Sequence, residues 1–165
     1  MLIYHGSNVA IKNPNAGFGR SNLDFGRGFY ATTLKDQAEK WALRRAVMMS
    51  GKAFVSVYEF DLTGLDILAF DGYSEEWLDF VVLNRAGENV VHKHDAIFGN
   101  IANDDVAAVV NDYMLLLQKG RITAEDKRFF LRQLQFSKPN NQYCIVSDRG
   151  ISAISFIESY RVEGN

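Results

Sequence analysis

The sequence is poor in the features that mark secreted and membrane proteins. Cys144 is its single cysteine, so an internal disulfide bond is excluded and nothing indicates an oxidising compartment. No apolar run approaches the roughly 18 residues that a transmembrane helix needs. The first residues lack the basic and apolar regions of a signal peptide. We therefore expect a cytoplasmic protein with no membrane partner.

A strong charge of either sign is also absent. The net charge of −2 and the pI of about 5.9 give no general electrostatic attraction to DNA or to an anionic membrane. Hydrophobic residues make up 47% of the 165 positions and charged residues 23%, which is typical of globular proteins that bury a core. Because there is no repeat, low-complexity tract or linker, we predict a single domain over residues 1–165.

The pattern of apolar residues predicts strands at both ends of the chain and helices in the middle. The predicted strands cover residues 2–7, 25–32, 53–60, 65–70, 95–99, 142–146 and 158–162, and the predicted helices cover 34–50, 75–86, 104–118, 124–135 and 149–157. We expect Thr33, Ser74 and Thr123 to precede helices as caps. Residues 8–24, rich in glycine and asparagine, are predicted to form a long loop. This order predicts an α+β fold.

Three short segments carry most of the residues that bear chemistry. They are Tyr4-His5-Gly6-Ser7, the glycine-rich segment 24–32, and Asn141-Gln142. In this order they resemble the ADP-ribosyltransferase superfamily, in the branch that includes diphtheria toxin and the poly-ADP-ribose polymerases. More narrowly, the chain resembles a family of bacterial proteins of which some are toxins of toxin–antitoxin pairs. The resemblance implies a split β-sandwich with NAD in the cleft and a helical insertion at about 71–137, which matches nothing in the family.

The first segment supplies a histidine followed by a glycine, which allows a ligand to approach the backbone closely. The resemblance implies that His5 donates a hydrogen bond to a ribose hydroxyl of NAD. It implies that the backbone of Gly6 pairs with the nicotinamide carboxamide. Ser7 matches the small hydroxyl residue that commonly follows this pair.

Two aromatic residues, Tyr30 and Trp41, lie eleven positions apart across a predicted strand-to-helix turn. The resemblance implies that they bracket the nicotinamide ring, which is a flat cation well matched to two aromatic faces. The family usually has a tyrosine at the second position. An alternative for Trp41 is a place in the apolar stripe of its helix.

Gln142 opens a late predicted strand at the position where the family usually has a glutamate. The resemblance implies that this residue binds the 2′-hydroxyl of the nicotinamide ribose and stabilises the developing oxocarbenium ion. Glutamine keeps the hydrogen bond and loses the charge, a kind of electrostatic contribution often worth about 3 kcal/mol. Asp148 is a candidate to supply that charge. His5, Tyr30 and Gln142 are the predicted catalytic residues.

Two arginines, Arg20 and Arg27, flank the glycine-rich loop. Their guanidinium groups match the oxygens of the NAD pyrophosphate, and solvated surface arginines are the alternative. The segment 26–31 formally fits the dinucleotide-binding pattern G-x-G-x-x-A. That interpretation is rejected, because no helix opens there and no βαβ unit follows.

Two rival sites involve cysteine and histidine. Cys144 with His5, His92 or His94 would form a thiol nucleophile and its base, but an apolar strand usually holds an inert cysteine. His92-x-His94 lacks a third ligand at a recognised spacing. We therefore expect no metal cofactor.

The resemblance implies a mono-ADP-ribosyltransferase that uses NAD as substrate and modifies a protein or nucleic-acid acceptor. A cognate antitoxin would be a further partner. The alternatives are an NAD glycohydrolase, a non-catalytic module that binds NAD or ADP-ribose, and a protein-interaction domain without NAD affinity. Loops as long as residues 8–24 are usually functional or mobile, and we expect this one to select the acceptor or to cover the NAD.

Overall fold

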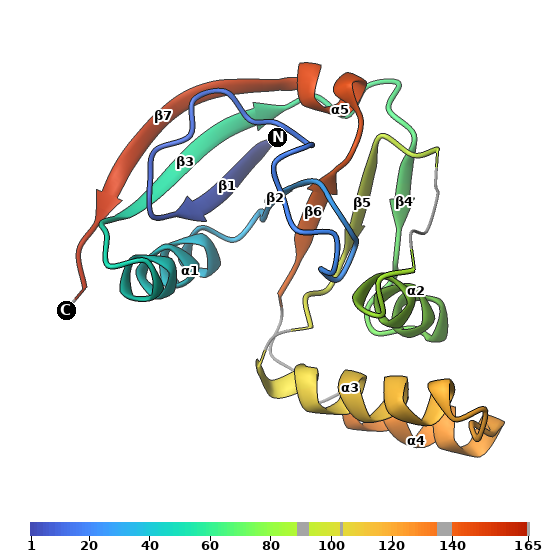
Figure 1. Ribbon diagram of the computed structural model, residues 1–165. Helices are drawn as coiled ribbons and strands as arrows, with labels where there is room; N and C mark the ends of the chain where they lie inside the picture. The colour runs from blue at the N-terminus through green and yellow to red at the C-terminus, as the bar shows by residue number, and fades with distance from the viewer. Residues whose placement is uncertain (89–92, 103, 135–139, 165) are drawn as a thin grey trace.

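The computed structural model describes residues 1–88, 93–102, 104–134 and 140–164. Their strands form two sheets (Figure 1). The three-stranded sheet is antiparallel in the order β1 (Leu2–Ser7), β3 (Ala53–Phe60) and β7 (Ile154–Val162). The four-stranded sheet has the order β2 (Phe29–Ala31), β6 (Gln142–Ile145), β5 (Ala96–Gly99) and β4 (Ile67–Ala69), of which β4 and β5 are parallel. The predicted α+β class is confirmed.

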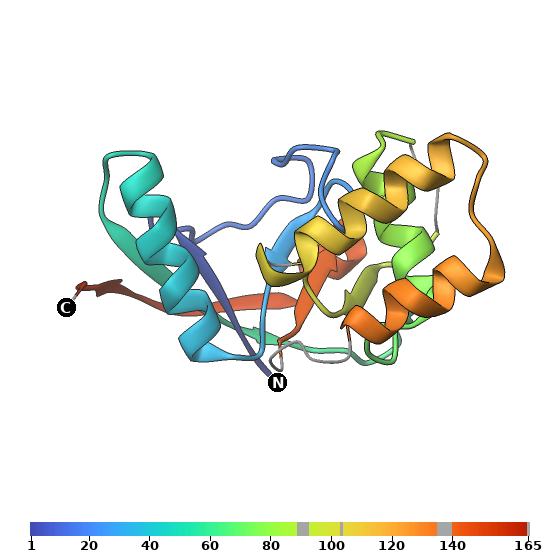
Figure 2. The ribbon, with the colours of Figure 1, turned by 90° about the horizontal axis from the view of Figure 1, so that it is seen from below.

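Helices cover the two sheets separately, as the view in Figure 2 shows from below. The helix α1 (Lys35–Met48) lies on the three-stranded sheet. Three helices lie beside the four-stranded sheet: α2 (Glu75–Arg85), α3 (Asp104–Gln118) and α4 (Ala124–Leu134). The short α5 (Asp148–Ser152) connects β6 to β7. None of the helices in the described part of the chain has both the length and the apolar character of a membrane span.

The two sheets are joined along one edge, where β1 meets the end of β2. Tyr4 N donates to Thr32 O over 2.8 Å, and Thr32 N donates to Tyr4 O over 2.9 Å. A cluster of buried side chains, here called the inter-sheet core, fills the space between the sheets. It consists of Ile3, Phe29, Ala31, Tyr58, Phe60, Ala96, Tyr143 and Ile145. The two hydrogen bonds at this edge and the inter-sheet core together fix the position of β1 relative to β2.

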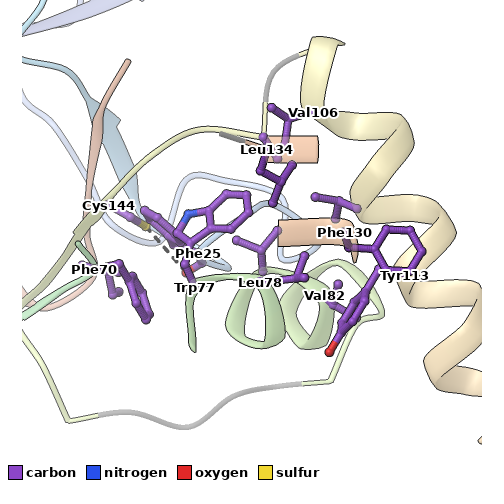
Figure 3. Packing of buried hydrophobic residues seen from close by; sticks show 14 residues of the cluster. Phe25, Phe70, Trp77, Leu78, Val82, Val106, Tyr113, Phe130, Leu134 and Cys144 are labelled. Carbon is purple, nitrogen blue, oxygen red and sulfur yellow. Dashed lines mark hydrogen bonds between the residues drawn. The ribbon is translucent and has the colours of Figure 1, made fainter. Parts of the chain in front are cut away.

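A larger core lies between the four-stranded sheet and the helices (Figure 3). Trp77 and Leu78 of α2 are fully buried there, between the sheet residues and the pair α3 and α4. Lys127 of α4 ties the pair to α2, because its Nζ lies 2.6 Å from Glu75 and 2.9 Å from Asp79. Three of the helices, α2, α3 and α4, lie within residues 71–137, together with the strand β5.

Several predicted elements are confirmed to within two residues, namely β3, α2, α3 and α4. Side-chain caps explain where two of these elements, α2 and α4, begin. Ser74 Oγ accepts from Trp77 N over 3.2 Å, and Thr123 Oγ1 accepts from Asp126 N over 3.1 Å. Hydrogen-bonding side chains at these positions end the preceding loop and begin the helix.

Four local predictions were wrong. The helix predicted at 149–157 ends at Ser152, and the chain enters β7 at Ile154. The strand predicted at 25–32 is limited to Phe29–Ala31, because Gly26 has a positive φ of 76° in a turn. Thr33 does not cap α1, which begins after Leu34 without a side-chain cap. The last strand begins at Ile154, and not near 158, because its register shifts beside Val57 and Tyr58 and leaves Ile157 as a bulge.

The close approach of α1 to β1 explains why residue 6 is a glycine. A Cβ atom at Gly6 would lie 2.1 Å from Ala38 O and 2.9 Å from Ala42 N. Both atoms belong to the backbone of α1, so they cannot move without displacing the helix. The missing side chain of Gly6 therefore serves helix packing, in addition to any role toward a ligand.

We predict that Gly6→Ala lowers the free energy of unfolding by about 3 kcal/mol, because the added methyl group forces α1 away from the sheet. Urea denaturation followed by circular dichroism measures the change. Gly51→Ala is the matched control, since a Cβ there would meet its nearest atom at 3.6 Å. Equal stability of the two variants would contradict this account of the packing.

Candidate functional site

His5 lies on β1, next to the point where the two sheets join. Its Nδ1 is 2.6 Å from Tyr30 O, and its ring stacks on Phe29 at a centroid distance of 4.7 Å. A carbonyl oxygen can only accept a hydrogen bond, so Nδ1 carries the proton. In the neutral imidazole, Nε2 is then an acceptor.

The surroundings of His5 favour the neutral ring. Burial lowers the pKa of His5 most strongly, the hydrogen bond to Tyr30 O raises it, and the nearby Arg45 guanidinium lowers it further. At neutral pH the imidazole is therefore uncharged, and Nε2 can accept a hydrogen bond. The resemblance had implied a donor at this position. The described contacts favour an acceptor.

The backbone of Gly6 lies at an edge that β2 leaves open. Alternate residues of an antiparallel strand direct their backbone groups to the same side, so Gly6 faces the same edge as Tyr4. Continuing the register of Tyr4 and Thr32 would pair Gly6 with Tyr30. Instead, Tyr30 O binds His5 Nδ1. Within the described residues, Gly6 makes no hydrogen bond on this edge, so its N–H and C=O are directed at the gap between the strands.

Tyr30 and Gln142 lie on one face of the four-stranded sheet. Tyr30 is paired with Cys144 across β2 and β6, and Gln142 is two residues before Cys144, so all three side chains share this face. Phe29, against which His5 stacks, lies on the other face. The structure thus brings His5 to the backbone of Tyr30, and Tyr30 to the neighbourhood of Gln142.

The phenol of Tyr30 is committed to the glycine-rich turn. Its hydroxyl donates to Gly26 O over 2.7 Å and accepts from Phe25 N over 3.1 Å. Burial raises the pKa of Tyr30 well above its ordinary value, so the phenol stays protonated. The ring, and not an ionised oxygen, is what Tyr30 offers to a ligand.

Gln142 is buried and belongs to a polar network. Its Nε2 lies 3.1 Å from Asp24 Oδ2 and 3.4 Å from Asn100 O. Asp24 is also bound by Arg85, whose Nη2 lies 2.7 Å from Oδ1. Asp148, the predicted source of charge, is exposed at the opposite end of β6. The carboxylate beside Gln142 is therefore that of Asp24, and the prediction for Asp148 was wrong.

Sequence reasoning missed Asp24, although it begins the quoted glycine-rich segment. It is the only acidic residue among the first 35 positions. That isolation, directly before a glycine-rich turn, was the available indication. Asn141 was also assigned no role, yet its side chain accepts from Thr33 N over 3.0 Å and its backbone binds Gln37 over 2.7 Å. These bonds hold the start of β6 against the start of α1.

Trp41 lies on α1 outside the buried stripe of that helix. The stripe consists of Ala38 and Ala42, whereas 48% of Trp41 is exposed. The alternative that Trp41 is part of the apolar stripe is therefore wrong. Gln37, Trp41 and Arg45 follow one another at helical spacing and so lie along one side of α1. Gln37 reaches β6 and Arg45 lies near His5, so this side of α1 faces the site.

Arg20 and Arg27 lie close together around an open depression of about 530 Å³. Its remaining lining residues are Gly19, Ser21, Asn22 and Leu23. Both arginines are exposed and no acidic residue lines the depression. Ser7, the last predicted binding residue, is buried at the end of β1 on the same side of the strand as His5.

The rival cysteine site is not supported. Cys144 is completely buried, and this burial raises the pKa of its thiol to about 12. A thiol in that state is a poor nucleophile. His92 lies outside the described residues. Nδ1 of His94 lies 3.1 Å from Asp66 Oδ1, on the side of the sheet formed by β4 and β5.

Residues 1–156 match the family described as protein of unknown function DUF3990. The chain belongs to this family. A comparison with curated proteins finds no significant match. The matched region includes His5, Tyr30 and Gln142 and ends within β7. The description of the family states no activity.

The lowered pKa of His5 predicts a pH-dependent stability. The ordinary value is about 6.5, so the contribution of neutral His5 is complete above that pH and is lost as the pH falls toward the lower folded-state value. His5→Gln removes the titration. We expect its free energy of unfolding to fall less than that of the wild type between pH 7.5 and pH 5. Urea denaturation at both pH values measures the difference. Equal losses of stability in the variant and the wild type would contradict the lowered pKa of His5.

We predict that Cys144 in the folded protein resists iodoacetamide at pH 8, because its thiol is both buried and protonated. Labelling should proceed rapidly once urea unfolds the chain. Mass spectrometry measures the labelled fraction. Rapid labelling without denaturant would contradict this prediction and would support Cys144 as a nucleophile.

Proposed function

We propose that this protein is a mono-ADP-ribosyltransferase that uses NAD as its substrate. The proposal includes the fold, since two sheets that meet at one edge fit the split β-sandwich of ADP-ribosyltransferases. The observation that carries it is the open edge at Gly6. There, one N–H and one C=O lie without a partner among the described residues, next to His5 and Tyr30.

The nicotinamide carboxamide matches this edge chemically. It offers one acceptor oxygen and one NH₂ donor, which complement the N–H and C=O of Gly6. The ring of the bound nicotinamide would then lie near Tyr30, with Trp41 as the second aromatic face. A cationic pyridinium ring is attracted by both faces. Trp41 is half-exposed, which supports this role, and the guanidinium of Arg44 already lies over its ring at 5.7 Å from the centroid.

Other described groups match the rest of NAD. Nε2 of neutral His5 is an acceptor for a ribose hydroxyl, and Gln142 supplies an amide on the same sheet face as the Tyr30 side chain. Arg20 and Arg27 provide two cations without an opposing acid in the lining of their depression, which suits a pyrophosphate.

In the proposed reaction, the bond between the nicotinamide nitrogen and C1′ of the ribose breaks, and its electron pair leaves with the neutral nicotinamide. A nucleophile of the acceptor forms the new bond to C1′ and releases its proton to solvent. The acceptor is a protein or a nucleic acid, and a cognate antitoxin would be a regulatory partner. The loop 8–24 carries Phe18, which is 89% exposed and available for such a contact.

A non-catalytic module that binds NAD or ADP-ribose is the second candidate. The charge state of the site favours it, because Gln142 is neutral and the carboxylate of Asp24 is paired with Arg85. Without an unpaired negative charge, the developing oxocarbenium ion receives less stabilisation. NAD glycohydrolysis, with water as acceptor, is the other enzymatic alternative.

We predict that the purified protein releases nicotinamide from labelled NAD, and that His5→Ala, Tyr30→Ala and Gln142→Ala each reduce the rate at least about tenfold. The control is Asp148→Ala, whose side chain is exposed at the far end of β6 and should leave the rate unchanged. Chromatography of free nicotinamide gives the rate.

Calorimetric titration with NAD separates the alternatives. Saturable binding without nicotinamide release would favour the binding module. The absence of both binding and release would contradict every NAD-dependent function considered for this site. Addition of a cell extract as a source of acceptor distinguishes transfer from hydrolysis, since only transfer attaches labelled ADP-ribose to a macromolecule.

A further inference from the structure

Asp24 is a buried carboxylate at the centre of the network around Gln142. Its Oδ1 accepts from Arg85 Nε over 2.9 Å. Its Oδ2 accepts from Ala102 N over 2.8 Å and from Gln142 Nε2 over 3.1 Å. The loop 8–24 ends at this residue, so Asp24 connects that loop to α2 and to the first residue of β6.

These contacts decide which way the amide of Gln142 points. Its Nε2 faces two acceptors, the carboxylate of Asp24 and the carbonyl of Asn100. A carboxylate and a carbonyl cannot donate, so the opposite orientation would set Oε1 against two oxygens. The NH₂ group is therefore held toward Asp24, and Oε1 is turned away from it as an acceptor.

We propose that Asp24 is a positioning residue that fixes Oε1 of Gln142 as the hydrogen-bond acceptor for the 2′-hydroxyl of the nicotinamide ribose. The inference rests on the proposed NAD site and adds a specific orientation to it. Asp24 acts through Gln142 and touches no substrate. The partly buried Arg85 holds the carboxylate in place, with Nη2 at 2.7 Å from Oδ1.

The variant Asp24→Asn tests this mechanism, because it keeps the shape of the side chain. Arg85 directs two N–H groups at Oδ1, so the asparagine directs its oxygen to Arg85 and its NH₂ to Gln142, and the hydrogen bond from Ala102 N is lost. The amide of Gln142 then turns over, and it offers a donor where it had offered an acceptor. The combination Asp24→Asn with Gln142→Glu exchanges the two groups. It keeps one amide and one carboxylate in contact with each other, and it restores an outward acceptor.

The measurement is the ratio of the affinities for NAD and for NAD that lacks the 2′-hydroxyl of the nicotinamide ribose, obtained by calorimetric titration. We expect the wild type to prefer NAD by about tenfold, the effect of one buried hydrogen bond. The preference should fall to within about twofold in Asp24→Asn and return in the exchanged double variant. Asp95→Asn, at another buried aspartate, should keep the wild-type ratio.

The outcomes separate this inference from the proposed function. If the wild type binds neither nucleotide, the NAD site and the inference both fail. If the wild type prefers NAD and Asp24→Asn keeps that preference, the NAD site stands and the role of Asp24 is wrong. Should Asp24→Asn fail to fold, the double variant decides alone. Its folding with restored preference supports the inference, and its unfolding or loss of preference overturns it.

Discussion

The two backbone hydrogen bonds between Tyr4 and Thr32 are the constraint on which the candidate site depends. They join the edges of the sheets at one point, and the inter-sheet core holds the strands in that relation. One residue further along β1, the imidazole of His5 donates a hydrogen bond to the carbonyl of Tyr30. In a continued ladder, that carbonyl would pair with Gly6 instead. The ladder therefore stops, and the N–H and C=O of Gly6 have no hydrogen-bond partner among the described residues. A change in strand pairing, and not a large pocket, creates this site.

The elements that the sequence predicted well are those whose determinants are local. β3 alternates between its two faces over eight residues, and α2 and α4 begin after side chains that cap them. The errors arise where distant segments decide the structure. Residues 25–28 were predicted to begin a strand, yet the hydroxyl of Tyr30 and the positive φ of Gly26 hold them in a turn. In β7, the bulge at Ile157 interrupts the alternation, so only the part after the bulge shows a strand pattern.

The residues of the candidate site also divide into those indicated by local sequence and those placed by distant contacts. His5, Gly6 and Tyr30 were chosen from short segments whose order resembles a known superfamily, and the structure brings the three together at the sheet junction. The glycine also proved to be required by α1, a contact between residues more than thirty positions apart that no local pattern encodes. Asp24 was missed for the same reason, because its partners Arg85 and Gln142 follow 61 and 118 residues later. Local motifs can name candidate residues, but the network that orients them is tertiary.

The carboxylate at position 24 also explains why position 142 holds an amide. A glutamate there would place a second carboxylate about 3 Å from the first, and two such groups cannot both be ionised in a buried site without a large free-energy cost. Arg85 already neutralises one carboxylate, and a second would need another cation. Glutamine instead donates to Asp24 and keeps an acceptor on its other side. A carboxylate at position 142 and the carboxylate of Asp24 are therefore alternatives at this site, and replacing one residue alone leaves either two charges or two amides in contact.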